Sequence, residues 1–128
     1  QRRYQFERLS QKKILRNFSM RINEIYTAYV SWGVSGKRRP VLVIEDRENN
    51  VFCYKITRKF SQKSEKIKRN YFPLKDWHQE GLVKQSYVDV GNIAKLSKEE
   101  IKFNFVGELS LRDIEALIRF ISDRYEMS

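Results

Sequence analysis

Residues 36–57 read Gly-Lys-Arg-Arg-Pro-Val-Leu-Val-Ile-Glu-Asp-Arg-Glu-Asn-Asn-Val-Phe-Cys-Tyr-Lys-Ile-Thr, and this stretch decides the fold. The run from Pro40 to Ile44 is continuously apolar, which is typical of a strand buried on both faces. Proline is tolerated there because it stands at the first residue of the strand. A polar turn over 45–50 separates this run from residues 51–57, which are rich in β-formers. The spacing predicts an antiparallel hairpin.

Segments on both sides of this hairpin also have strand character. The composition predicts further strands over 24–30, 71–74, 85–93 and 102–109, the second of them at an edge and the last broken at Gly107. Residues 31–39 hold two glycines and three consecutive bases, so we expect a loop there. Residues 58–70 lack an apolar period and are expected to form a basic loop.

Helical patterns occur at the two ends of the chain. Ser110 with Asp113 predicts the start of a helix over 110–124, whose apolar residues follow the 3.6-residue period. Residues 2–20 have a less regular apolar stripe, so we expect a basic, helical N-terminal extension over 1–22 and a barrel domain over 23–128. About five short strands with a terminal amphipathic helix predict a mainly β fold with α (α+β), a small half-open barrel.

The charge of the chain indicates an anionic partner. Its 128 residues hold 26 Lys and Arg against 16 Asp and Glu, a net charge of +10, and nucleic acid is the commonest anionic partner. Residues 1–22 and 55–69 each carry seven basic residues and one acid. A solvated face is the plainer interpretation of either run alone, whereas two runs of one sign favour a shared anionic surface.

The composition excludes several classes of site. Cys53 and His78 are the only cysteine and histidine, which rules out an intrachain disulfide, a multi-cysteine zinc site and a His-rich metal site. We therefore expect neither a metal nor a cofactor. No apolar run approaches the ~20 residues of a membrane span, and no signal peptide is visible, so we expect a cytoplasmic setting without a membrane partner. Because the sequence does not begin with Met, we expect it to be part of a longer or processed product.

Three motifs in order resemble the MazF/PemK toxins of bacterial type II toxin–antitoxin pairs. Residues 36–44 resemble the family's loop ending in Arg-Pro and its apolar strand, and Cys-Tyr-Lys-Ile-Thr over 53–57 resembles its next strand. Ser-Tyr-Val-Asp-Val-Gly-Asn-Ile-Ala-Lys-Leu over 86–96 is similar to the strand that closes with a Gln-Ile-Arg-Thr-like motif. The resemblance covers about residues 23–121.

This resemblance implies an SH3-like barrel and a sequence-selective, metal-independent endoribonuclease. Such an enzyme would cleave single-stranded mRNA as a homodimer and would be inhibited by a cognate antitoxin. The family's catalytic arginine corresponds to Arg39 and its strand-end hydroxyl to Thr57. These residue types suit cleavage by the ribose 2′-hydroxyl, because a guanidinium binds two phosphate oxygens at once and preorganised donors stabilise the dianionic phosphorane.

The third motif departs from the family pattern. Many members carry a carboxylate where this chain has Gly91, and Asn92 stands at the place of their Gln. Asp89 lies two residues earlier, would share a face with Gly91 in an ideal strand, and is a candidate substitute. The RNA-binding residues that we predict are Asp89, Asn92, Lys37, Arg38, Arg58, Lys59, Lys63 and Trp32. Trp32 has two open interpretations, stacking on a base or covering the end of the barrel.

Two other functions fit the same barrel. A nucleic-acid-binding module without catalysis is suggested by the missing carboxylate at Gly91. A gyrase-targeting toxin similar to CcdB would use the same fold on a protein target. The Arg-Pro motif argues against this third interpretation, since that toxin acts mainly through its C-terminal residues.

Overall fold

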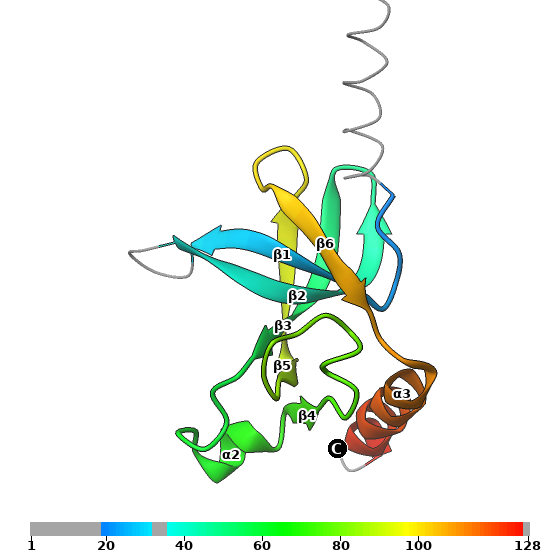
Figure 1. Ribbon diagram of the computed structural model, residues 1–128. Helices are drawn as coiled ribbons and strands as arrows, with labels where there is room; N and C mark the ends of the chain where they lie inside the picture. Colours follow the sequence, from blue (N-terminus) through cyan, green and yellow to red (C-terminus); the bar gives the residue numbers. More distant parts are fainter. Residues whose placement is uncertain (1–18, 32–35, 127–128) are drawn as a thin grey trace, which may run out of the picture.

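The computed structural model describes residues 19–31 and 36–126 (Figure 1). The expected N-terminal extension therefore lies almost entirely outside the described residues, as does Trp32. Within the described ranges the strands are β1 (Glu24–Ser31), β2 (Gly36–Arg47), β3 (Asn50–Thr57), β4 (Tyr71–Pro73), β5 (Tyr87–Ser97) and β6 (Phe103–Glu108). Two helices accompany them, α2 (Glu65–Lys68) and α3 (Leu111–Glu126).

The described strands form one open, antiparallel sheet in the order β4-β5-β3-β2-β1-β6 (Figure 1). The predicted hairpin is β2 and β3, which pair from Arg47 with Asn50 down to Val41 with Lys55. The predicted edge strand is β4, which pairs with β5 at one end of the order. The expectation of a mainly β fold, half open and with a C-terminal helix, is confirmed.

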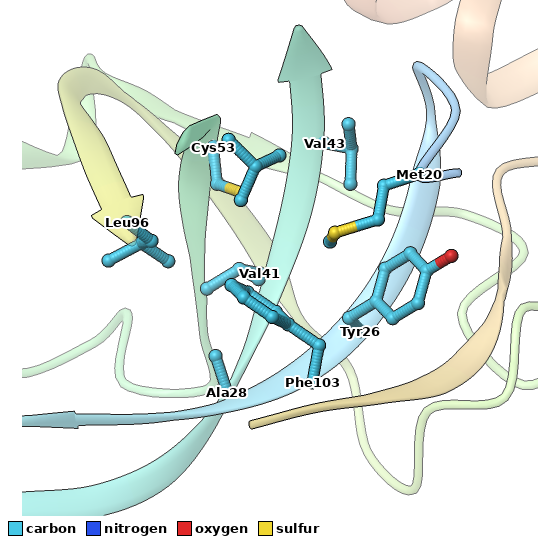
Figure 2. Close-up of a cluster of buried hydrophobic side chains, with 9 residues drawn as sticks. Met20, Tyr26, Ala28, Val41, Val43, Cys53, Leu96 and Phe103 are labelled. Atoms are coloured by element: carbon cyan, nitrogen blue, oxygen red, sulfur yellow. The ribbon is translucent and has the colours of Figure 1, made fainter. Parts of the chain in front are cut away.

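Both faces of the sheet carry a hydrophobic core. Val41, Leu42 and Val43 are all at most 1% exposed, which confirms that this run is buried on both faces. The first core consists of Met20, Tyr26, Ala28, Val41, Val43, Val51, Cys53, Leu96 and Phe103 (Figure 2). The second core contains Leu42 and Ile56 and is covered by α3, whose Leu117 is buried in it. Alternation along the strands therefore separates an inner core from a core shared with the helix.

The N-terminal segment is tied into the first core at Met20. This side chain is 3% exposed, and its backbone N–H donates to Asp46 Oδ2 at 3.0 Å. Met20, which the predicted boundary places in the extension, thus packs in the first core.

Three local predictions need correction. Residues 36–39 were expected in a loop, but they belong to β2 because they pair with Ala28–Ser31 of β1. The basic segment 58–70 contains the short helix α2, which Ser64 caps by accepting a hydrogen bond from Ile67 N–H at 3.4 Å. The last strand was expected to be broken at Gly107, but β6 continues to Glu108 and only shifts register beside this glycine, since Ile25 pairs with Gly107 and Tyr26 with Phe105. A Cβ on Gly107 would lie 2.3 Å from the Glu80 carbonyl oxygen, so the glycine serves a close backbone approach.

None of the described helices combines the length and apolar character that a membrane crossing requires.

Candidate functional site

One face of the sheet changes from apolar to polar at the same level on neighbouring strands. Along β3 this face continues from Cys53 in the first core to Lys55 and then Thr57. Along β2 the same face continues from Val41, which pairs with Lys55, to Arg39. The apolar core therefore ends where these two strands begin to carry charged and hydroxyl side chains.

The polar end of this face extends over β5 and β4. Lys55 pairs with Asp89, and Asp89 pairs with Tyr71, so these three residues form one row across three strands. The next pair on this face, toward the end of β3, is Thr57 with Tyr87. Side chains directly opposite each other in antiparallel strands have Cβ atoms about 5 Å apart. We call this end of the face the polar end, and it consists of Lys55, Asp89, Tyr71, Thr57 and Tyr87 together with Arg39 of β2.

Arg39 and Thr57 lie at the same end of the sheet. Arg39 is half-buried and pairs with Ala28 of β1, so it stands on a strand instead of a preceding loop. The described ladder between β2 and β3 stops at the Val41–Lys55 pair. Beyond it β2 continues along β1, whereas β3 continues toward β5 and β4 (Figure 1). The two candidate catalytic residues thus flank the place where the strands diverge.

The Thr57 hydroxyl has a fixed acceptor role that leaves its hydrogen available. Its Oγ1 accepts a hydrogen bond from the Lys59 backbone N–H at 3.1 Å. A threonine hydroxyl is one donor and a double acceptor, so this bond leaves its hydrogen for an acceptor such as a phosphate oxygen. Arg58 and Lys59 follow directly and are exposed. The end of β3 thus offers one hydroxyl donor beside two cations.

Asp89 is a buried acceptor in this row. Asp89 is 3% exposed. Its carboxylate accepts hydrogen bonds from Gly91 N–H at 2.9 Å and from the side-chain amide of the exposed Asn92 at 3.4 Å. β5 bulges at this point, since Tyr54 pairs with Ile93 but the adjacent Lys55 pairs with Asp89. The ideal-strand alternation that predicts a shared face for Asp89 and Gly91 therefore does not hold here.

The space beside Gly91 is filled by Asn70. A Cβ on Gly91 would lie 2.6 Å from Asn70 Nδ2. Asn70 is held by its neighbours, since its carbonyl accepts from Val90 N–H at 2.9 Å and its Oδ1 accepts from the Arg124 guanidinium of α3. The position at which many MazF/PemK proteins carry a carboxylate is thus packed against an amide.

The remaining predicted RNA-binding residues are divided among several places. Lys37 shares the face of Arg39, whereas Arg38 lies on the opposite face with its cross-strand partner Tyr29. Lys63 is half-buried in the basic loop, and its backbone N–H donates to the Phe60 carbonyl at 3.1 Å. The structure therefore brings Lys37, but not Arg38, to the face of Arg39.

The sequence interpretation missed a group of aromatic rings beside Thr57. Phe60 stacks on Tyr87 with centroids 4.4 Å apart and planes inclined by 14°, and Phe60 lies 6.4 Å from Tyr71. We call Phe60, Tyr71 and Tyr87 the aromatic stack. Burial and the nearby Asp89 raise the pKa of Tyr71. Phe60, an aromatic residue inside the basic segment 58–70, was the signal in the sequence that could have indicated this group. Its stacking on Tyr87 could not be predicted, because it depends on the register that pairs Tyr87 with Thr57.

A second buried polar cluster joins the segment before β5 to the start of α3. The Asp113 carboxylate accepts from Lys75 N–H at 3.1 Å and from Asp76 N–H at 3.0 Å. Glu80 is 1% exposed and accepts from Ser110 N–H at 2.8 Å. Burial and the neighbouring Asp113 raise the pKa of Glu80 to about 7. These bonds fix the beginning of the helix.

Across the described residues, no three His, Cys, Asp or Glu side chains are grouped as metal ligands.

Comparison with known proteins identifies the architecture. No protein-family model and no curated protein matches this chain. Among solved structures it is similar to the Mycobacterium tuberculosis toxin MazF-mt6, with 22% identity and a TM-score of 0.58. The similarity covers 80% of this chain and 96% of that one. The chain therefore has a MazF-like fold.

Proposed function

We propose that this chain is the toxin of a toxin–antitoxin pair and a metal-independent endoribonuclease that cleaves single-stranded mRNA. The observation that supports the proposal is that the register puts Arg39, Lys55, Thr57 and Asp89 on one face of the sheet, around the place where β2 and β3 diverge. The MazF-like fold and the ordered motifs support the same function. Two cations, a hydroxyl donor and a buried carboxylate are a set suited to a phosphodiester.

Cleavage proceeds by attack of the ribose 2′-oxygen on the adjacent phosphorus. The 2′-hydroxyl proton passes to solvent water, the bond from phosphorus to the 5′-oxygen breaks, and the departing oxygen takes a proton from solvent. This leaves a cyclic phosphate on one fragment and a 5′-hydroxyl on the other. Arg39 binds the non-bridging oxygens through its guanidinium fork, and the Thr57 hydroxyl donates to one of them. Both interactions strengthen as the phosphorane gains its second negative charge. Arg39 acts electrostatically, since a guanidinium stays protonated in proteins.

The partners in this proposal follow from the surface charge. The basic segment 55–69 surrounds Thr57, and it would attract single-stranded RNA as well as an acidic segment of a cognate antitoxin. An antitoxin bound there would exclude RNA from Thr57 and its neighbours. We also propose that the chain acts as a homodimer, as the resemblance to MazF/PemK toxins implies.

The direct test is incubation of the purified chain with long single-stranded RNA in EDTA. We expect discrete fragments with 5′-hydroxyl ends. The loss of these fragments in Thr57→Val, at an unchanged melting temperature, would assign the cleavage to this site. Several RNAs of different sequence are needed because the preferred cleavage sequence is unknown. Intact RNA in every reaction would refute the nuclease.

A second candidate is a nucleic-acid-binding module without catalysis. The packing of Asn70 against Gly91 favours it, since an amide occupies the space of a possible third-motif carboxylate. Such a module would bind RNA with an affinity that falls steeply with salt and would leave the strand uncut. The same incubation, followed by a binding measurement at two salt concentrations, separates the two functions.

A further inference from the structure

The aromatic stack lies directly beside the candidate hydroxyl. Tyr87 is the cross-strand partner of Thr57, and Phe60 stands three residues after Thr57 and folds back onto the Tyr87 ring. The Lys59 N–H that binds Thr57 Oγ1 belongs to the residue next to Phe60. A nucleotide whose phosphate contacts Thr57 would therefore carry its base close to these rings.

Phe60 and Tyr87 do not serve to fill a core. Neither of the two hydrophobic cores formed by the described residues includes them, and both side chains are half-buried. Helix α2, which follows Phe60, has no buried residue of its own. The rings are thus partly accessible, and cations of the segment 58–69 stand close to them in the sequence.

Phe60 has one face that a flexible side chain covers. The Tyr87 ring occupies the first face, and Lys68 Nζ lies over the ring at 5.0 Å from its centroid. Because the Tyr87 ring blocks the first face, the ammonium covers the second. Lys68 is half-buried, and its ammonium is also ion-paired with Glu65 Oε1 at 3.5 Å. A base can replace the ammonium on such a ring, and the lysine stem can turn its charge toward a phosphate, which then takes the place of Glu65 as its anionic partner.

We propose that the second face of Phe60 is a stacking platform for a base of single-stranded RNA, next to the nucleotide phosphate held at Thr57. The base displaces Lys68 from the ring, and the ammonium moves to the RNA backbone. Because every base has a π-face, the platform accepts all four bases. The inference rests on the proposed function for its ligand, and it adds a base-binding residue to that site.

The test uses 2′-O-methyl oligonucleotides, in which the attacking hydroxyl is blocked, so that binding is measured without cleavage. One series carries all bases, and in the others a single base is removed at each position in turn. Fluorescence anisotropy gives Kd for the wild type, for Phe60→Leu, which keeps an apolar contact with Tyr87, and for Phe105→Leu. Phe105 is an exposed phenylalanine on β6, at the opposite edge of the sheet, and is the matched control.

We expect Phe60→Leu to bind the complete oligonucleotide about 5- to 100-fold more weakly than the wild type. On one of the oligonucleotides that lack a base, this difference should disappear, because the base that stacks is already absent. Phe105→Leu should bind as the wild type does. Phe60→Trp offers a larger ring, so it should bind the complete oligonucleotide at least as tightly, and it decides the question if Phe60→Leu does not fold.

Two results would overturn the platform: equal affinity of Phe60→Leu and the wild type, or a loss that persists on every oligonucleotide lacking a base. Cleavage of unmodified RNA by the wild type is scored separately. A base-dependent loss without cleavage refutes the nuclease and keeps the platform, whereas cleavage without a base-dependent loss refutes the platform alone. A wild type that binds no oligonucleotide refutes the platform, and it refutes the nuclease as well if unmodified RNA also stays intact.

Discussion

The two ends of one sheet face share the strands β2 and β3 and differ in the side chains that these strands carry there. At one end Val51 and Cys53 of β3 are fully buried among apolar residues, and at the other Lys55 and Thr57 continue the same face. We call the first the apolar end. Folding needs the apolar end because burial supplies its main driving force. At the polar end Lys55 and Thr57 are only half-buried, so they contribute less apolar burial than Val51 and Cys53 do.

The two ends also treat charge differently. At the apolar end Lys98 has a fully buried side chain, and it is ion-paired with Asp46, whose other oxygen accepts the Met20 N–H. A buried charge is costly unless it is paired in this way. At the polar end Arg58 and Lys59 are exposed beside the Thr57 hydroxyl. Charge is therefore paired inside the fold at one end and exposed at the other.

The largest expected effect separates two adjacent arginines. Arg39 shares the face of Thr57, whereas Arg38 points to the opposite face beside Tyr29. Arg39→Ala should lower kcat for RNA cleavage by about 10²- to 10³-fold, as removal of one preorganised donor does elsewhere. Arg38→Ala, which removes the same charge from the neighbouring position, should leave kcat within a few-fold of the wild type. Single-turnover cleavage of one labelled RNA measures both. Equal losses of kcat in the two variants would show that cleavage depends on the net charge and not on the face of the sheet that carries the arginine.

A smaller effect compares stability along β3. Cys53 is 0% exposed, and burial raises the pKa of its thiol to about 12, so it is a neutral apolar group. Cys53→Ser places a hydroxyl among apolar side chains and should lower the free energy of unfolding by about 1–3 kcal/mol. Thr57→Val on the same face should change it by less than about 0.5 kcal/mol. Urea denaturation followed by circular dichroism measures both variants. A large loss in Thr57→Val would mean that the polar end also stabilises the fold.

The bulge in β5 provides a third comparison. Gly91→Ala puts a Cβ 2.6 Å from Asn70 Nδ2, and Asn70 is held by Arg124 and Val90. The displacement should cost about 1 kcal/mol of stability. Asn92→Ala, one residue away and exposed, should leave the melting temperature unchanged while weakening the orientation of Asp89. Thermal unfolding of the two variants measures the difference. An unaffected Gly91→Ala would show that Asn70 can move freely.

The hairpin and the final helix are predictable from the sequence because local patterns determine them. The apolar run at Val41–Val43 and the period of residues 110–124 each identify an element without knowledge of its neighbours. The strand extent of residues 36–39 is not local, because it depends on pairing with Ala28–Ser31. The polar end depends on registers between distant strands. No local pattern places Tyr87 beside Thr57 or shifts β5 by a bulge after Asp89.

The last comparison concerns Glu80, a buried carboxyl beside another acid, in contrast to the half-buried Asp46, which has the buried Lys98 as its cationic partner. Burial and Asp113 raise the pKa of Glu80 from the ordinary 4.5 to about 7, although the hydrogen bond from Ser110 N–H opposes this rise. Asp76 and Arg112 also belong to this cluster, and their hydrogen bond lowers the pKa of Asp76, so Asp76 titrates at more acid pH. Glu80 is therefore expected to differ in charge between the folded and unfolded chains from about pH 4.5 to pH 7.

The sign of the pH dependence follows from the protons bound. Between about pH 4.5 and pH 7 the folded chain keeps the proton on Glu80 while the unfolded chain has lost it. The free energy of unfolding should therefore fall as the pH rises through this window and level off above it. Glu80→Gln, which imitates the protonated acid, should remove this decline. Urea denaturation of both proteins at several pH values measures it. If the free energy of unfolding changed with pH in the same way in the wild type and in Glu80→Gln, Glu80 would be ionised in the folded chain. The contrast with the paired charge of Asp46 would then disappear.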